Sequence, residues 1–222
     1  MHTHLFDQVG AMTKVAVITA GLGVPSSSRM LADQLSDALR TELSLSGQDA
    51  TVDVLELRNY AVDIAQHLVS GFAPPALAAA IQSVTDADAL IVVSPVFTGS
   101  YSGLFKSFFD VIDNTALEGM PVLMGATGGS ARHALVLEHA MRPLFTYLRT
   151  RVVPTAVYAA PQDWGVGEDD EPALEQRARR AARELAAMLA GRSVTPARPA
   201  NDRIEPSAPF EDLLARIQAP AS

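Results

Sequence analysis

Five short apolar runs, each followed by a stretch with helical periodicity, constrain the fold of this chain more than any other feature. The first and third runs are continuous apolar stretches rich in Val and Ile, as are strands that are buried on both faces. Strands that alternate with helices predict one parallel sheet with helices on both faces and right-handed crossovers, a doubly wound α/β fold. The runs are KVAVITA (14–20), TVDVLELR (51–58), DALIVVS (88–94), PVLMGAT (121–127) and RVVPTAVYA (151–159).

The helical segments between these runs are predicted from their spacing. In the first of them Leu31, Leu35 and Leu39 repeat every four residues and form one apolar face. Pro143 is expected to kink the fourth helix. Pro154 would break a hydrogen bond in a central strand, so the last strand is expected at an edge of the sheet. The predicted helices are 29–43, 74–84, 102–112, 131–149 and 171–190.

Length and composition bound the domain organisation. The 222 residues suffice for one such domain, which we expect over residues 13–191, after a flexible extension of residues 1–12. Residues 192–222 form a tail in which PFEDLLARI (209–217) is amphipathic, and this patch either docks on a protein surface or is loosely ordered. The net charge of −8 argues against a nucleic-acid partner, and the absence of cysteine excludes disulfides and thiol catalysis. No apolar stretch approaches the roughly 20 residues of a membrane span, so a cytoplasmic location without membrane contact is expected.

Ligands bind beyond the carboxyl ends of strands in an open α/β sheet, and three turns there have unusual compositions. The first turn, AGLGVPSSSRM (20–30), has Gly21 and Gly23 before a run of hydroxyls at the start of a helix. Free amides and the helix dipole favour an anion there, although the serines could simply cap the helix. A dinucleotide motif would need glycine at position 26, so a monophosphate is preferred. The candidate phosphate ligands are Ser26, Ser27, Ser28 and Arg29.

The second turn, SPVFTGSYSGLFK (94–106), combines small residues with aromatic side chains. Pro95 is expected to end the preceding strand. Gly99 allows a flat ligand to approach the backbone, and Phe97 and Tyr101 offer contacts to a ring. Lys106 either meets an anion or solvates the helix surface. The candidate ring-binding residues are Pro95, Val96, Phe97, Thr98, Gly99 and Ser100.

The third turn, ATGGSARHA (126–134), exposes several amide groups at one point, which suits the electron-rich edge of a heterocycle. Its candidate ligands are Thr127, Gly128, Gly129 and Ser130, of which Ser130 is also expected to cap the next helix. Arg132 and His133 either meet the phosphate of a nicotinamide nucleotide or belong to the surface. No metal site is expected.

Taken together, the three turns resemble those of the NAD(P)H-dependent FMN reductase family. The matching residues are Ser26–Arg29; Pro95, Phe97, Ser100, Gly103 and Lys106; Thr127–Ser130; and His133, Leu135, Arg142, Pro143 and Leu144. Many relatives carry tyrosine where this chain has Phe97, which leaves the role of that hydroxyl open. The resemblance is strongest to the reductase components of two-component flavin monooxygenases.

This resemblance implies a flavodoxin-like sheet of five parallel strands in the order 2-1-3-4-5. It implies that NAD(P)H delivers hydride to N5 of FMN, that reduced FMN passes to a partner monooxygenase, and that the chain forms a homodimer or homotetramer. The flavin carries the chemistry, so no catalytic acid–base pair is expected. Two alternatives remain at this point: a reductase of quinones, azo compounds or metal ions that keeps its FMN, and an electron carrier of the flavodoxin type without enzyme activity.

Overall fold

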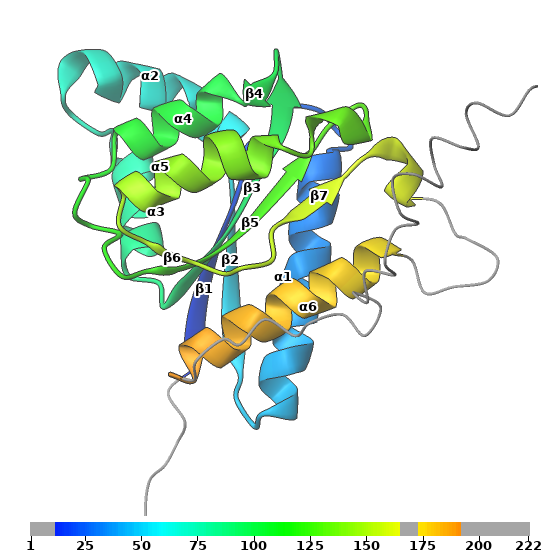
Figure 1. Ribbon diagram of the computed structural model, residues 1–222. Coiled ribbons are helices and arrows are strands. Elements are labelled where there is room, and N and C mark those ends of the chain that lie inside the picture. The colour runs from blue at the N-terminus through cyan, green and yellow to red at the C-terminus, as the bar shows by residue number, and fades with distance from the viewer. Residues whose placement is uncertain (1–11, 165–172, 192–222) are drawn as a thin grey trace, which may run out of the picture.

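The computed structural model describes residues 12–164 and 173–191. A parallel sheet in the order β2-β1-β3-β5-β6 runs through the molecule (Figure 1). Two short strands lie off this path, one antiparallel to β3 and one parallel to β5. The predicted order 2-1-3-4-5 and the doubly wound fold are therefore confirmed. The strands are β1 (Thr13–Thr19), β2 (Ala50–Glu56), β3 (Ala89–Phe97), β4 (Ser100–Tyr101), β5 (Pro121–Thr127), β6 (Arg151–Val152) and β7 (Val157–Ala159).

Helices cover both faces of the sheet (Figure 1). Alternate residues of β1 point to opposite sides: Val15 and Val17 pack with one helix layer, and Ala16 and Ile18 with the other. The first layer holds α1 (Ser27–Leu45) and α6 (Ala173–Leu189). The second holds α2 (Ala61–Ser70), α3 (Pro75–Thr85), α4 (Gly103–Asp110) and α5 (Arg142–Tyr147).

The last strand lies at the edge of the sheet and is interrupted, as Pro154 predicts. It is divided into β6 and β7, and both parts pair with β5. Glu184 of α6, which is only 7% exposed, accepts hydrogen bonds of 2.7 Å from both the amide and the hydroxyl of Thr155. Arg142 donates to the carbonyl of Pro154 at 3.3 Å. Side chains from α5 and α6 thus form hydrogen bonds with the backbone between β6 and β7.

The prediction that Pro95 ends the third strand is wrong. Strand β3 continues to Phe97, and Pro95 lies opposite Thr127 of β5. Pairing with β1 stops at Val93, so the strand has a free side where Pro95 stands. A proline is tolerated where no neighbouring strand needs its amide.

The predicted helix over 131–149 is also wrong as one element. The structure instead has a 3₁₀ turn (η2, Ala131–His133), a π-helical turn (η3, Leu137–Met141) and then α5. Pro143 lies in the first turn of α5, where its missing amide hydrogen costs little.

Two elements after β2 were not predicted. The second strand ends at Glu56 rather than at residue 58, and a 3₁₀ turn (η1, Leu57–Tyr60) leads into α2. A further 3₁₀ turn, η4 (Pro161–Trp164), follows β7. The expected extension up to residue 11 and the tail 192–222 with its amphipathic patch lie outside the described residues. No single described helix is long and apolar enough to cross a membrane, and only the bent pair Leu57–Ser70 and Pro75–Thr85, at 94°, reaches that length and composition together.

Candidate functional site

The three predicted turns meet at the carboxyl end of the sheet. The hydroxyls of Ser28 in the first turn and Thr127 in the third lie 2.8 Å apart and are buried. The second turn is adjacent to the third, because a Cβ atom built on Gly128 would lie 3.5 Å from Cβ of Val96. Residues that are 99 positions apart in the sequence are thus joined by one hydrogen bond. The predicted convergence is present.

Ser26 begins α1 as its N-cap. Its hydroxyl accepts from the amide of Arg29 at 3.2 Å, and its carbonyl accepts from Met30. Within the described part of the chain, the amides of Ser27 and Ser28 donate to no protein group. These two amides and the helix dipole suit an anion. Capping by Ser26 and anion binding by its neighbours are therefore compatible.

Glycine is required at position 21 by close packing within this turn. A Cβ atom there would lie 2.0 Å from the hydroxyl oxygen of Ser26. Any larger residue at this position would displace the Ser26 side chain, which caps α1.

Arg29 is not free to place its whole guanidinium on a ligand. Its Nε atom donates to Asp33 at 2.8 Å, and Nη1 donates to Glu56 at 2.9 Å. The hydrogen bond with Asp33, followed by the negative charges of Asp33 and Glu56, raises the pKa of Arg29 above its ordinary value. A guanidinium has five N–H groups, so donors remain for an anion.

Glu56 and Arg58 are two residues of this site that sequence reasoning missed. Glu56, the last residue of β2, pairs with Arg58 Nη2 at 2.5 Å through its second oxygen. Arg58 Nη1 in turn donates to the carbonyl of Gly23 in the first turn at 2.7 Å. The carboxyl end of β2 lies beside that of β1, where ligands bind in such a sheet. The charged residues at the end of the second strand were therefore a sequence signal by which this cluster could have been found.

The second turn is a tight hairpin between β3 and β4. Phe97 pairs with Ser100, and the two residues between them have positive φ values of 50° for Thr98 and 82° for Gly99. Two-residue hairpins with this backbone favour glycine at the second position. The hairpin leaves Phe97 45% exposed at the site. Lys106 pairs with Asp110 on the surface of α4.

The third turn is held by Tyr158 of β7, another residue missed from the sequence. Its buried hydroxyl donates to the carbonyl of Ser130 at 2.8 Å, and burial followed by the nearby charge of Asp163 raises the pKa of Tyr158. A Cβ atom on Gly128 would lie 2.2 Å from this hydroxyl, whereas one on Gly129 would meet nothing within 4 Å. Glycine at 128 is thus required by the tyrosine.

The predicted capping role of Ser130 is wrong, because its side chain makes no capping hydrogen bond to η2. Arg132 and His133 lie in η2, directly after the third turn, and both are exposed. Their contact with a nicotinamide nucleotide stays a prediction. Among the described residues, no group of three or more His, Cys, Asp or Glu could hold a metal ion.

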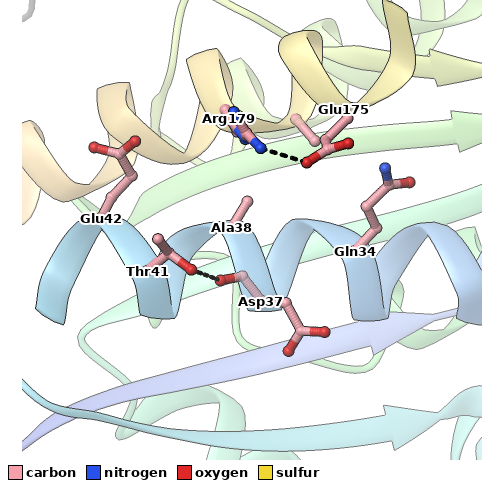
Figure 2. A pocket seen from close by; sticks show the side chains of 8 residues that line it. Gln34, Asp37, Ala38, Thr41, Glu42, Glu175 and Arg179 are labelled. Carbon is pink, nitrogen blue, oxygen red and sulfur yellow. Dashed lines mark hydrogen bonds and ion pairs between the residues drawn. The ribbon is translucent and has the colours of Figure 1, made fainter. Parts of the chain in front are cut away.

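Among the hollows of the described residues, one lies away from the three turns and another borders the second turn. A pocket of about 490 Å³ between α1 and α6 is bordered by Asp37, Glu42 and Glu175, and Glu175 pairs with Arg179 (Figure 2). Glu42 pairs with Arg183. This pocket borders the middle of α1 rather than its amino end, so it is separate from the candidate site. A groove of about 580 Å³ lies between α4 and α5, with Tyr101 and Tyr147 on its lining.

Comparisons with known proteins show similarity along most of the chain. The family model described as NADPH-dependent FMN reductase matches residues 13–165. A Pseudomonas aeruginosa protein named FMN reductase (NADPH) is 40% identical over 81% of this chain and 94% of its own length. A Pseudomonas fluorescens protein named NADH-dependent FMN reductase SfnF is 38% identical over 82% of this chain and 95% of its own.

Solved structures show the same fold. An oxidoreductase from Corynebacterium diphtheriae is 42% identical with a TM-score of 0.78, over 82% of this chain and 99% of that one. The apo form of an NADH:FMN oxidoreductase, EmoB, has a TM-score of 0.65 over 83% of this chain and 92% of that one. Its identity is 23%, so this likeness concerns the fold alone.

Proposed function

Because this chain belongs to the NADPH-dependent FMN reductase family, we propose that it reduces FMN with NADPH or NADH at the three turns and releases the reduced flavin to a flavin-dependent monooxygenase. Family membership makes the chain an oxidoreductase that uses FMN and NAD(P)H. The observation that carries the placement is the buried Ser28–Thr127 hydrogen bond, which brings an anion-binding turn beside an amide-rich turn.

The first turn fits the phosphate of FMN. An anion is favoured there by the free amides of Ser27 and Ser28 and by the remaining N–H groups of Arg29. A neutral turn without these donors would leave a phosphate poorly solvated. The phosphate is therefore assigned to the amino end of α1.

The second and third turns fit the ring. Phe97 offers an exposed aromatic face, and the space beside Gly129 lets a flat group approach the backbone. When bound, FMN supplies the redox chemistry by accepting hydride from the nicotinamide at N5. The amide of Gly128 donates to the carbonyl of Ala159 at 3.2 Å, so the amides of Gly129 and Ser130 are the ones that stabilise negative charge at the pyrimidine edge of the ring. Tyr158 keeps these amides in place through Ser130.

The chain's contribution is mainly positioning. Two reactants held in a productive geometry react much faster than in solution, so no acid–base pair is needed. Arg132 and His133 are the proposed contacts for a phosphate of the nicotinamide nucleotide, since both are exposed beside the third turn. One relative is named for NADPH and another for NADH, so both reductants belong in the test.

Oxidation of NADPH and NADH by the purified protein, with and without added FMN, tests the proposal. We expect oxidation that saturates with FMN concentration and reduces many FMN molecules per protein molecule. A purified monooxygenase that requires reduced FMN should then become active in the same mixture. No oxidation with either nucleotide would favour an electron carrier. Oxidation that needs only one tightly bound FMN and a quinone would favour the alternative reductase.

The proposed assembly is a homodimer or homotetramer in which a second copy covers the groove between α4 and α5. Tyr147 on this groove is 71% exposed and Leu135 on the preceding segment is 64% exposed. Tyr101 joins the groove to the second turn, so an interface here would reach the flavin site. Light scattering should give a mass of two or four chains, and Tyr147→Glu should lower that mass.

A further inference from the structure

We infer that Glu56 competes with the FMN phosphate for Arg29 and thereby keeps FMN exchangeable, a role that rests on the proposed function of the chain. Glu56 does not need to touch the flavin for this role. It acts through Arg29 as a residue that sets affinity.

The contacts of Glu56 support this role. One carboxylate oxygen accepts from Arg29 at 2.9 Å and the other pairs with Arg58 at 2.5 Å. The Glu56 side chain is 19% exposed, against 37% for Arg29 and 27% for Arg58. It is thus the least exposed member of a three-residue charge cluster beside the first turn.

Asp33 also binds Arg29, but the two acidic partners differ in setting. Asp33 lies one turn further along α1 and is 48% exposed, so solvent screens its charge more strongly. Glu56 comes from a different element, β2, and its position is fixed by pairing of that strand with β1. Asp33 makes the hydrogen bond that raises the pKa of Arg29 most, whereas Glu56 is the less exposed partner and is held in place by the sheet.

A phosphate monoester carries between −1.5 and −2 charges at neutral pH. When it arrives at the amino end of α1, it must share the positive charge of Arg29 with Glu56. The carboxylate and the phosphate also repel each other at short range. Both effects lower the affinity for FMN, which suits a flavin that leaves after reduction rather than a permanently bound one.

Arg58 has a separate task in the same cluster. Through its bond to the Gly23 carbonyl at 2.7 Å it ties the first turn to the end of β2. Glu56 balances this second cation too. Loss of the Glu56 charge therefore leaves two arginines beside the phosphate position without their shared partner, while the bond between Arg58 and Gly23 needs no carboxylate.

The test is Glu56→Gln, measured by titration of FMN and of riboflavin and by the rate of FMN release. Glutamine keeps the length of the side chain and removes its charge. We expect FMN to bind on the order of 10-fold more tightly, from the size of a charge interaction at a partly exposed site, and to leave more slowly. Riboflavin has no phosphate, so its affinity should not change.

Glu118→Gln is the matched control. Glu118 pairs with Arg149 at 3.3 Å and precedes β5, at the opposite end of the sheet from the three turns. The Glu118→Gln substitution changes the net charge by the same amount as Glu56→Gln, but the affinity for FMN should stay at the wild-type value. In an Arg29→Ala background, Glu56→Gln should lose most of its effect.

Three results would overturn the inference: FMN affinity that is unchanged or weaker in Glu56→Gln, an equal change for riboflavin, or full tightening in the Arg29→Ala background. If Glu56→Gln fails to fold, Glu56→Asp provides the test, because its shorter side chain weakens the contact with Arg29 and should tighten FMN to a smaller degree. Failure of the proposed function looks different, since wild-type protein would then either fail to oxidise NADPH and NADH with added FMN or would need only one tightly bound FMN to do so.

Discussion

The first and third turns lie side by side yet are held in opposite ways. The first turn is largely exposed and is held by ion pairs. Glu56 pairs with both Arg29 and Arg58 beside it. The third turn is organised by neutral contacts, a buried tyrosine hydroxyl on the Ser130 carbonyl and a glycine that fits against it. Charge interactions respond to salt and to single charge changes, whereas close packing does not. Affinity can therefore be tuned at the phosphate end while the ring end stays fixed.

Arg29→Ala should have the largest effect on FMN affinity, because it removes a charge at the first turn and leaves the third turn intact. Removal of a charged hydrogen-bond donor should weaken FMN binding by roughly 1.5–3 kcal/mol. Riboflavin binding should hardly change, because it lacks the phosphate. Fluorescence titration of both flavins measures the difference, and equal losses for the two ligands would mean that Arg29 does not act at the phosphate.

Gly128→Ala should affect the third turn through packing. The added methyl group would overlap the Tyr158 hydroxyl at 2.2 Å, and overpacking of this kind costs about 1–3 kcal/mol. Chemical denaturation should show that loss in the free energy of unfolding. The affinities for FMN and for riboflavin should fall by the same factor. Gly129→Ala is the control, since a Cβ atom at that position meets nothing within 4 Å. Equal stability of the two variants would contradict the assigned contact.

Thr127→Val tests the link between the two turns. It leaves the buried Ser28 hydroxyl without its partner at 2.8 Å, which should lower stability by about 1–2 kcal/mol. Adding Ser28→Ala removes the stranded hydroxyl and should cost less than the sum of the single changes. Strict additivity in this double-mutant cycle would show that the two turns are not coupled through this bond.

Tyr158→Phe should have the smallest effect, about 0.5–1.5 kcal/mol of stability for one lost hydrogen bond. The folded state raises the pKa of Tyr158, so its contribution is fully present below the ordinary pKa of 10.0 and is lost as the pH rises through the higher folded value. The difference between wild type and variant should thus be constant at neutral pH and shrink in strong alkali. A difference that grows with pH would oppose the assigned cause.

The centre of the sheet was predictable from the sequence because β1, β3 and β5 are continuous apolar runs, and the edge position of Pro154 followed from the lost amide. Helix α2 was not predictable by the same rule. Of its residues only Ile64 is buried, and Val62 and Val69 are 80% and 88% exposed. Several apolar residues of this helix therefore face solvent rather than the core, so its apolar residues do not by themselves mark a helix that packs on the sheet.

The turns that carry the site were recognised from composition, but the residues that hold them were not. Glu56, Arg58 and Tyr158 act through contacts made by distant segments, such as Tyr158 with Ser130 at a separation of 28 residues. The charges at the carboxyl end of β2 were a signal for Glu56 and Arg58, whereas the local sequence carries no mark of the contact that Tyr158 makes. Pro95 misled for a related reason, since whether a proline ends a strand depends on which neighbours that strand has at that point.

A crystal structure of the protein with FMN would show directly whether the three turns bind the flavin. We expect the phosphate at hydrogen-bond distance from the amides of Ser27 and Ser28 and from Arg29, with the ring between Phe97 and the third turn. A phosphate bound elsewhere, or a ring that touches neither Phe97 nor Gly129, would contradict it.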